Sequence, residues 1–394
     1  MWKKPWSLKE GFVIGSGLVA TGLLLQFSVG SIDWDLFAWP ANVILIVVLL
    51  VGTTVMHFLR KRVYLFRFLS TMNAAVPALL WAVVLTVIMG LTRQASPEHI
   101  ISQGSHGMLG DMGITYMLGY WPFVLIYAWM ALILSLTVLK RWRKPRWRDI
   151  PFYLNHLGLL IVIVCGTLGS ADMQRLTMTI GQERPEWRAL NKQGQVVELP
   201  IAIQLDEFQL NEYPPRVVVA NTKSGTVADA APKVNIIRTI EKAAPVSSED
   251  STWYVAWPSS GAVTALYVNT GHREGWLSSG SYLFPMQMLS LNDSLSLAIT
   301  EREPRAFVSK VHIYTKTQKN ILTTIEVNKP FCVDGWKIYQ LDYDRQKGRW
   351  SDISVLELVN DPWLPVVYLG ITMLLLGAVC MFLFTHRKER RANE

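Results

Sequence analysis

Six apolar runs, each long enough to cross a lipid bilayer, constrain this chain more than any other feature. A helix needs about 20 mainly apolar residues to span the hydrocarbon core, and 51% of the 394 residues are hydrophobic. Because lipid offers no hydrogen-bond partner to the backbone, each run is predicted to be helical. The sequence therefore predicts an integral membrane protein with transmembrane α-helices near residues 12–29, 41–59, 74–91, 114–139, 152–168 and 364–384.

The basic residues indicate how the chain crosses the membrane. Lys and Arg outnumber Asp and Glu by 38 to 30, giving a net charge of +8. The surplus gathers beside the apolar runs, at residues 3–4, 60–62, 140–148 and 386–391. Short loops rich in Lys and Arg face the cytoplasm, so both termini are expected there, in a bacterial cytoplasmic membrane. This bias accounts for the charge, so we expect a lipid bilayer and no nucleic acid as partner.

One large segment lies between the fifth and sixth runs and is expected on the periplasmic side. Apolar and polar residues alternate in it at 295–300, 311–315, 336–341 and 353–358, a pattern typical of strands. Turn-forming pairs such as Asp334-Gly335 separate these stretches. The fold class predicted is thus six membrane helices with one large extracytoplasmic β-rich domain between helices five and six. Within it, we expect a weak helix at 228–242 and a surface loop at 232–250.

These features predict four parts in the chain. Residues 1–66 form a two-helix hairpin with a basic linker, and 67–170 form a three-helix membrane segment. Residues 171–363 form the β-rich domain, and 364–394 form the last helix and a cytoplasmic tail. The three cysteines form neither a Cys-x-x-Cys nor a Cys-x-x-Cys-His motif. The chain is therefore expected to be neither a thiol oxidoreductase nor itself a c-type cytochrome.

His156 is the main candidate for a functional residue. It follows Asn155 near the start of the fifth apolar run. An imidazole at membrane depth is costly without a partner and marks a site for a proton, an ion or a metal. The alternative is a hydrogen bond to a backbone carbonyl on a neighbouring helix. His57, which ends the second run, is either an interfacial side chain or a second ligand. His99 and His106 occupy a loop, where histidines are usually solvated.

Five blocks of sequence, in order, resemble the ResB/CcsB family of System II cytochrome c maturation. The most specific is Val-Asn-Lys-Pro-Phe at 327–331 followed by Asp-Gly-Trp-Lys-Ile-Tyr-Gln at 334–340, which resembles the family's "VNKPL…G…YQ" signature. The block at 155–160, Asn-His-Leu-Gly-Leu-Leu, resembles its third span. Further blocks lie at 65–75, 110–123 and 361–370. Residues 119–123, Gly-Tyr-Trp-Pro-Phe, depart from the family's His-Ser-Trp-Trp-Phe.

The resemblance implies a subunit that binds haem b in transit and docks apocytochrome c for covalent haem attachment. It implies that His156 is an axial ligand of haem iron, with His57 as a possible second one, and it assigns no catalytic residue. The chain lacks the Trp-Trp-Asp motif of the family's CcsA/ResC partner. We therefore expect a non-autonomous subunit that acts with a CcsA/ResC-like membrane protein and with a thiol-reducing thioredoxin-like protein.

Two other functions stay open from the residues alone. One is a b-type haem electron-transfer subunit of a quinol-linked membrane oxidoreductase. Such proteins usually hold each haem between two histidines on facing spans, and only His57 and His156 lie in apolar runs here. The other is a signalling protein with an outer β sensor, which the short cytoplasmic ends disfavour.

Overall fold

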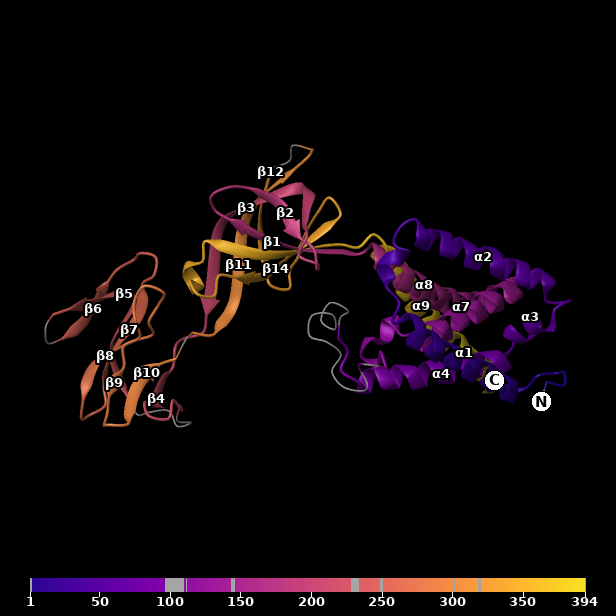
Figure 1. Ribbon diagram of the computed structural model, residues 1–394, viewed down its shortest axis with the longest axis horizontal. Helices are drawn as coiled ribbons and strands as arrows, with labels where there is room; N and C mark the ends of the chain where they lie inside the picture. Colours follow the sequence, from indigo (N-terminus) through magenta and orange to yellow (C-terminus); the bar gives the residue numbers. More distant parts are fainter. Residues whose placement is uncertain are drawn as a thin grey trace. The chain divides into compact units, whose positions relative to one another are not determined.

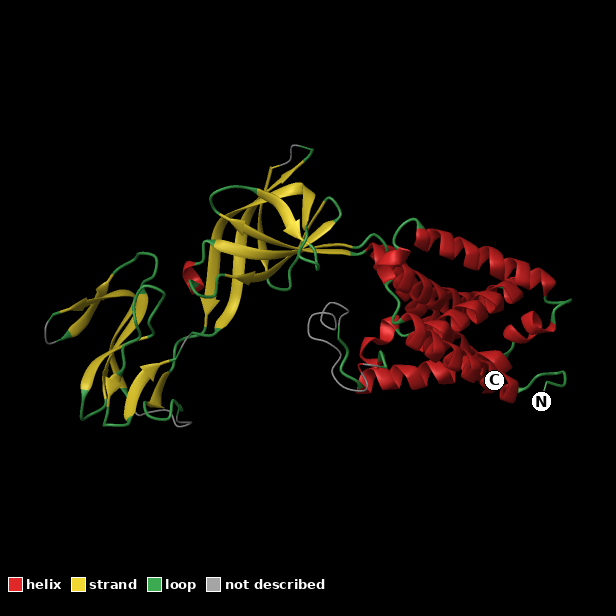
Figure 2. Cartoon of the chain, viewed as in Figure 1, coloured by secondary structure: helices red, strands yellow, loops and turns green. Residues whose placement is uncertain are grey.

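The computed structural model describes residues 2–95, 110, 112–142, 146–227, 234–248, 251–300, 302–317 and 320–393, with side chains described as far as 383. His99 and His106 lie outside these residues. The chain forms two compact units. The membrane unit comprises Met1–Gln174 and Asn360–Glu394, and the β unit comprises Arg175–Val359. Figure 2 shows that the first unit is helical and that the second is built from strands.

In the described part of the chain, six helices are long and apolar enough to cross a membrane, which confirms the predicted spans. They are α1 Leu8–Val29, α2 Ala41–Leu59, α4 Met72–Leu91, α7 Trp121–Trp142, α8 Ile150–Gly169 and α9 Leu364–Asn393 (Figure 1). Shorter pieces connect them: η1 Trp34–Phe37, α3 Tyr64–Leu69, η2 Ile114–Gly119, η3 Trp147–Asp149 and η4 Ser170–Asp172. The chain is a multi-pass membrane protein.

Glycines on one face of α1 bring it close to α4 and α7. A Cβ atom at Gly15 would lie 2.4 Å from the ring of Trp81 on α4, and one at Gly22 would lie 2.5 Å from the backbone nitrogen of Pro122 on α7. Small residues allow such approach in a membrane, where burial of apolar surface gives little drive to helix association. These three helices enclose the apolar core of the unit, which includes Ala78, Met117, Ile126 and Leu136.

Helices α8 and α9 form a second close pair. A Cβ atom at Gly158 would lie 2.7 Å from the carbonyl oxygen of Gly370, and one at Gly377 would lie 2.4 Å from the side-chain nitrogen of Asn155. At the far end of α8, a Cβ atom at Gly169 would meet the side chain of Trp363 at 2.5 Å. The face of α8 that carries Asn155, Gly158 and Gly169 is thus covered by α9.

The β unit contains an eight-stranded sheet in the order β12-β11-β3-β2-β1-β15-β14-β13. Its strands are β1 Gln174–Gly181, β2 Glu186–Leu190, β3 Val196–Glu212, β11 Pro304–Thr315, β12 Asn320–Glu326, β13 Phe331–Val333, β14 Trp336–Tyr343 and β15 Ile353–Asn360. The predicted alternation is confirmed in β11, β14 and β15, where every second residue is buried along most of the strand. The core includes Met178, Ile203, Ile313, Ile338 and Leu356.

Two smaller sheets complete the β unit, in the orders β6-β5-β7-β8 and β4-β10-β9. Their strands are β4 Val217–Asn221, β5 Asn235–Ser247, β6 Thr252–Ala256, β7 Val263–Asn269, β8 Glu274–Ser278, β9 Leu289–Ser290 and β10 Leu295–Ile299. The predicted helix at 228–242 and loop at 232–250 are therefore wrong over residues 235–247. Residues 228–233 and 249–250 lie outside the described ranges. Strand β5 forms because β6 and β7 pair with it on both edges, and such pairing overrides local propensity.

Candidate functional site around His156

His156 lies about two turns into α8, and one bond fixes its ring. Its Nδ1 atom is 3.0 Å from the carbonyl oxygen of Phe152, one turn earlier in the same helix. A carbonyl oxygen only accepts, so Nδ1 carries the proton and Nε2 keeps its lone pair. The carbonyl belongs to the histidine's own helix and not to a neighbouring one. This bond orients the imidazole and leaves Nε2 as a possible ligand atom.

An aromatic ring of α8 and a cation of α7 support the imidazole. The Phe152 ring stacks on the imidazole with centroids 4.0 Å apart and an interplanar angle of 28°. The guanidinium of Arg141, on α7, lies 4.4 Å from the centroid of the Phe152 ring. Arg141 in turn donates to the Asp149 carboxylate from Nη2 at 2.6 Å and from Nε at 3.1 Å. Asp149, Arg141 and Phe152 therefore act in series to support His156.

The imidazole is half-buried and lies on a face of α8 that the chain covers only in part. Helical spacing puts Leu159 and Thr167 on this face. Both side chains are exposed. A metal-bound histidine usually donates its second ring N–H to a carbonyl or carboxylate. The bond to Phe152 meets this requirement, so His156 fits an axial haem ligand. The haem would contact α8 on this partly covered face.

His57 lies in the last turn of α2, at the same end of the membrane unit as His156. Its Nδ1 atom is 3.5 Å from Nη1 of Arg60, and its ring meets the edge of the Phe58 ring. Helix α2 packs mainly on α7 and touches α8 only slightly. The two histidine-bearing helices thus share α7 as a neighbour and do not face each other along their length. In the described ranges, no group of three or more His, Cys, Asp or Glu side chains is arranged to hold a metal ion.

The block at 327–340 has a conformational role in the β unit. Asp334 and Gly335 have φ values of +46° and +84° and form the two-residue loop between the paired Val333 and Trp336. Loops with two positive φ values match the twist of a hairpin and favour Asp-Gly or Asn-Gly. Asn328, with φ of +63°, occupies the preceding turn. These residues form the tight connections that the sequence predicts.

Gln340 of the same block is a buried polar link between strands. It is 6% exposed, and its Nε2 atom donates to the hydroxyl of Ser354 on β15 at 2.7 Å. The hydroxyl of Ser309 on β11 donates to that of Ser354 at 2.8 Å. Buried polar groups cost free energy unless they are hydrogen-bonded, so this chain of bonds defines how β11, β14 and β15 pack.

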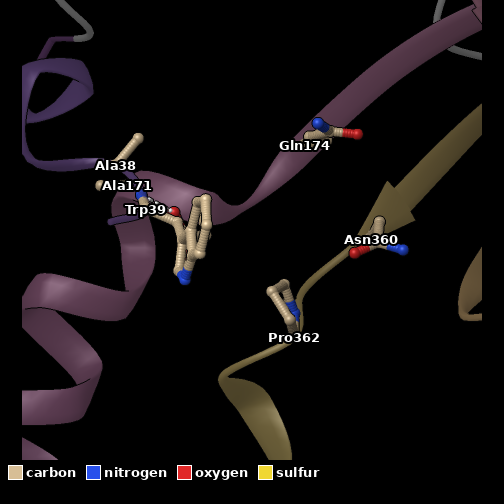
Figure 3. Close-up of a pocket in the computed structure, with 7 residues that line it drawn as sticks. Ala38, Trp39, Ala171, Gln174, Asn360 and Pro362 are labelled. Carbon is tan, nitrogen blue, oxygen red and sulfur yellow. Dashed lines mark hydrogen bonds between the residues drawn. The ribbon is translucent and has the colours of Figure 1, made fainter. Parts of the chain in front are cut away.

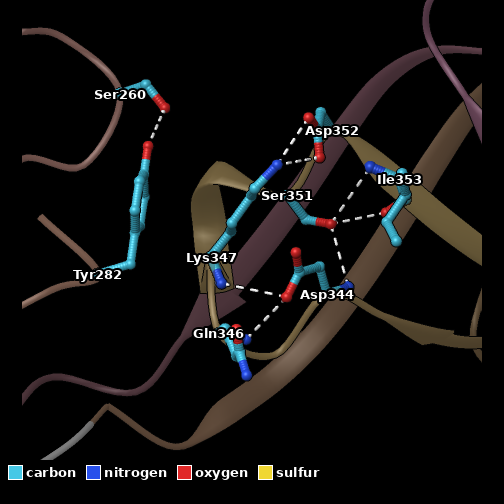
Figure 4. A network of polar contacts seen from close by, with 8 residues as sticks. All are labelled: Ser260, Tyr282, Asp344, Gln346, Lys347, Ser351, Asp352 and Ile353. Atoms are coloured by element: carbon cyan, nitrogen blue, oxygen red, sulfur yellow. Dashed lines mark hydrogen bonds and ion pairs between the residues drawn. The ribbon is translucent and has the colours of Figure 1, made fainter.

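A polar network shapes the turn around η5 (Gly348–Trp350), between β14 and β15 (Figure 4). Nζ of Lys347 lies 2.8 Å from both carboxylate oxygens of Asp352, and this hydrogen-bonded pairing raises the pKa of Lys347. The Asp344 carboxylate accepts the backbone N–H of Gln346 at 2.9 Å. The hydroxyl of Ser351 donates to the carbonyl of Ile353 at 2.6 Å. The network fixes the shape of the turn.

Sequence reasoning missed a partly buried charge cluster next to this turn. Arg349 donates to the backbone carbonyl of Glu241 on β5 at 3.0 Å, and Arg302 forms an ion pair with the Glu241 side chain at 2.5 Å. Burial lowers the pKa of Arg349. Burial also raises the pKa of Glu212, and the positive charges of Arg349 and Arg302 partly oppose this rise. The cluster ties β5 to the η5 turn. No local motif could have found it, because its members are far apart in the sequence.

Comparison with known families connects these features. The model of the ResB-like family matches residues 284–351, all within the β unit. A search of curated proteins found no match. The matched residues contain the block at 327–340 and the η5 turn, whereas His57 and His156 lie outside them. The match confirms the resemblance seen in the sequence motifs. Together with the membrane spans, it supports a membrane protein of the cytochrome c biogenesis type.

Proposed function

Because the chain combines a match to the ResB-like family with six membrane spans, we propose that it is a subunit of a cytochrome c synthase complex. It binds haem b in transit and helps to deliver it to apocytochrome c. The single observation that carries the proposal is the state of His156. Its Nδ1 proton is held by the Phe152 carbonyl at 3.0 Å, so a neutral Nε2 is available to ligate iron.

In this proposal, residues near His156 hold and orient haem. Phe152 keeps the imidazole plane fixed, and Arg141 supports Phe152 while adding positive charge near the ring. Basic side chains of the loops at this end would pair with the haem propionates. His57 is a candidate for a second ligand. Haem is the cargo of the subunit and leaves it with the cytochrome.

The attachment step itself needs a partner. Each apocytochrome thiol adds its S–H across a haem vinyl group, forming a C–S bond and moving the proton to the other vinyl carbon. A CcsA/ResC-like membrane protein would supply the reaction site, and a thioredoxin-like protein would keep the thiols reduced. The β unit, on the periplasmic side with both termini cytoplasmic, would dock the apocytochrome.

The test is the haem content of the complex purified after co-expression with a CcsA/ResC-like partner. We expect His156→Ala to lower bound haem at least about tenfold, since even loss of a group that supports a metal ligand costs 10- to 100-fold. Imidazole added to the buffer should restore part of the haem in this variant. Met72→Ala, at an exposed side chain on α4 at the same end of the unit, is the matched control.

Two outcomes would contradict the proposal. One is unchanged haem content and cytochrome yield in His156→Ala. The other is stoichiometric, redox-active haem in the chain expressed without a partner, which would favour the electron-transfer subunit instead.

A further inference from the structure

A pocket of about 400 Å³ lies in the membrane unit, at the opposite end of α8 from His156 (Figure 3). It forms where the η1–α2 connection, the η4 turn and the residues before α9 meet. Its lining consists of Ala38, Trp39, Ala171, Asp172, Gln174, Asn360 and Pro362. In Figure 3 the indole of Trp39 projects between Ala171 and Pro362, and the amides of Gln174 and Asn360 lie beyond it.

Asp172 supplies an ionised group to this pocket. One carboxylate oxygen accepts the backbone N–H of Trp39 at 2.6 Å. The other accepts the side-chain amide of Asn42 at 2.7 Å and the indole N–H of Trp363 at 2.6 Å. All three donors are neutral. Each oxygen of a carboxylate accepts about two hydrogen bonds, so the oxygen bound to Trp39 has room for one more.

No cation of this chain neutralises the carboxylate within the described residues, because none of the ion pairs found there includes Asp172. The three segments around the pocket, 33–42, 170–174 and 360–364, contain four Asp residues and no Lys, Arg or His. One of the four, Asp361, caps the start of α9 by accepting the backbone N–H of Leu364 at 3.0 Å. The pocket is therefore anionic and suits a positively charged ligand.

Trp39 gives the pocket an aromatic wall. Its side chain is 72% exposed although it lines the pocket. An indole face attracts an ammonium group within about 6 Å of the ring centroid. A carboxylate oxygen that can accept one more hydrogen bond, next to an exposed indole ring, is an arrangement that recognises an organic ammonium ion.

The position of the pocket identifies the source of that ion. Helices α2, α8 and α9 begin or end here, at the level where a bilayer changes from acyl chains to headgroups. We propose that the pocket binds the primary ammonium group of a phospholipid headgroup, which donates to Asp172 and lies against Trp39. An anionic headgroup would be repelled by Asp172, and a quaternary ammonium has no N–H to donate. The inference is independent of the proposed function.

The experiment measures which lipids stay bound to the full-length protein in native mass spectrometry. The protein is incubated with an equal mixture of phosphatidylethanolamine, phosphatidylcholine and phosphatidylglycerol. We expect phosphatidylethanolamine to be retained above the other two. Trp39→Leu should lower its retention about two- to fivefold, the loss expected from a cation–π contact near the surface. Leu36→Ala, on an exposed residue of the same connection, is the matched control.

A second pair of variants tests the carboxylate. Asp172→Asn should reduce retention more than Trp39→Leu does, and Asp35→Asn should leave it unchanged. If Asp172→Asn fails to fold, Trp39→Leu still decides, because leucine keeps the backbone N–H that donates to Asp172. Displacement of the lipid by free ethanolamine would show that the ammonium group is sufficient, and resistance would show that the rest of the lipid contributes. Equal retention of phosphatidylethanolamine and phosphatidylglycerol, or unchanged retention in Trp39→Leu, would overturn the proposal.

Discussion

Residues 155–160 of the membrane unit and residues 327–340 of the β unit both resemble blocks of one family, yet their side chains have different roles. In the β unit, Asp334 and Gly335 form a hairpin loop, and the side-chain nitrogen of Gln340 donates to Ser354 inside the sheet. In the membrane unit, Gly158 serves packing in the same way, but His156 keeps Nε2 free. Blocks that resemble one family therefore mark a fold in the β unit and, under the proposed function, a ligand atom in the membrane unit.

The largest effect should come from filling the contact between α8 and α9. Gly158→Leu would force a side chain against the Gly370 carbonyl, where even a Cβ atom would lie at 2.7 Å. Backbone cannot yield as a flexible side chain does, so we expect a loss of about 3 kcal/mol. Thermal unfolding in detergent measures it. Gly166→Leu, on the same helix but with open space around it, is the control. Equal losses in both variants would show that Gly158 has no special packing role.

A substitution in the hairpin loop of the β unit should cost less free energy of unfolding. Gly335 has φ of +84°, and a side chain in this region of backbone space costs about 1–2 kcal/mol. Gly335→Ala is therefore expected to speed amide hydrogen exchange in β13 and β14. Gly181→Ala serves for comparison, because its Cβ would meet only the Asp352 carbonyl, at 3.9 Å. Haem content should not change in either variant. A lower haem content in Gly335→Ala would contradict the purely conformational role of the block at 327–340.

Removing the stack on His156 should affect haem but not the fold. Phe152→Leu loses an aromatic contact with centroids 4.0 Å apart, worth about 0.5–1.5 kcal/mol. Haem retention in the purified complex should fall about two- to tenfold, since each 1.4 kcal/mol is tenfold. Phe27→Leu, at an exposed ring on α1, is the control and should leave haem retention unchanged. Unchanged retention in Phe152→Leu would contradict the role given to Phe152.

The smallest effect concerns an ion pair of the β unit. Hydrogen bonds from Arg188 lower the pKa of Glu186 from 4.5 to about 2. A carboxyl whose pKa is lower in the folded state adds stability above its unfolded pKa and loses it as pH falls. The unfolding temperature should thus drop on acidification from about pH 5 to pH 2. The part of this drop that comes from Glu186 should be absent in Glu186→Gln. For a surface ion pair, that part corresponds to at most about 1 kcal/mol of unfolding free energy. Glu183→Gln, exposed near the start of β2, should keep the wild-type pH profile.

Much of the fold could be predicted because its signals are local. The length of the apolar runs was enough to locate the spans, and α2 begins and ends at the predicted residues. Period-2 alternation located β11, β14 and β15. Strand β5 was missed because its Lys, Glu and Ala residues are poor strand formers, and only pairing with β6 and β7 makes it a strand.

The site was only partly predictable for a related reason. His156 stands out in the sequence because a polar side chain in an apolar run needs an explanation. Its tautomer depends on the carbonyl of Phe152, and its support depends on Arg141 of another helix. The Glu241–Arg302–Arg349 cluster and the Asp172 pocket join residues more than 40 positions apart. Such groups appear only once the chain has folded.

The proposed function depends on whether Nε2 of His156 is bound to haem iron. The most direct measurement is the optical and electron paramagnetic resonance spectrum of the purified complex with His156→Cys. A thiolate in place of imidazole should change the Soret band and the g values, because the axial ligand sets the electronic state of the iron. Met72→Cys, at an exposed position on α4, provides the reference for a cysteine at the same end of the unit. A wild-type spectrum in His156→Cys, with haem content unchanged, would contradict the proposed ligand role of His156.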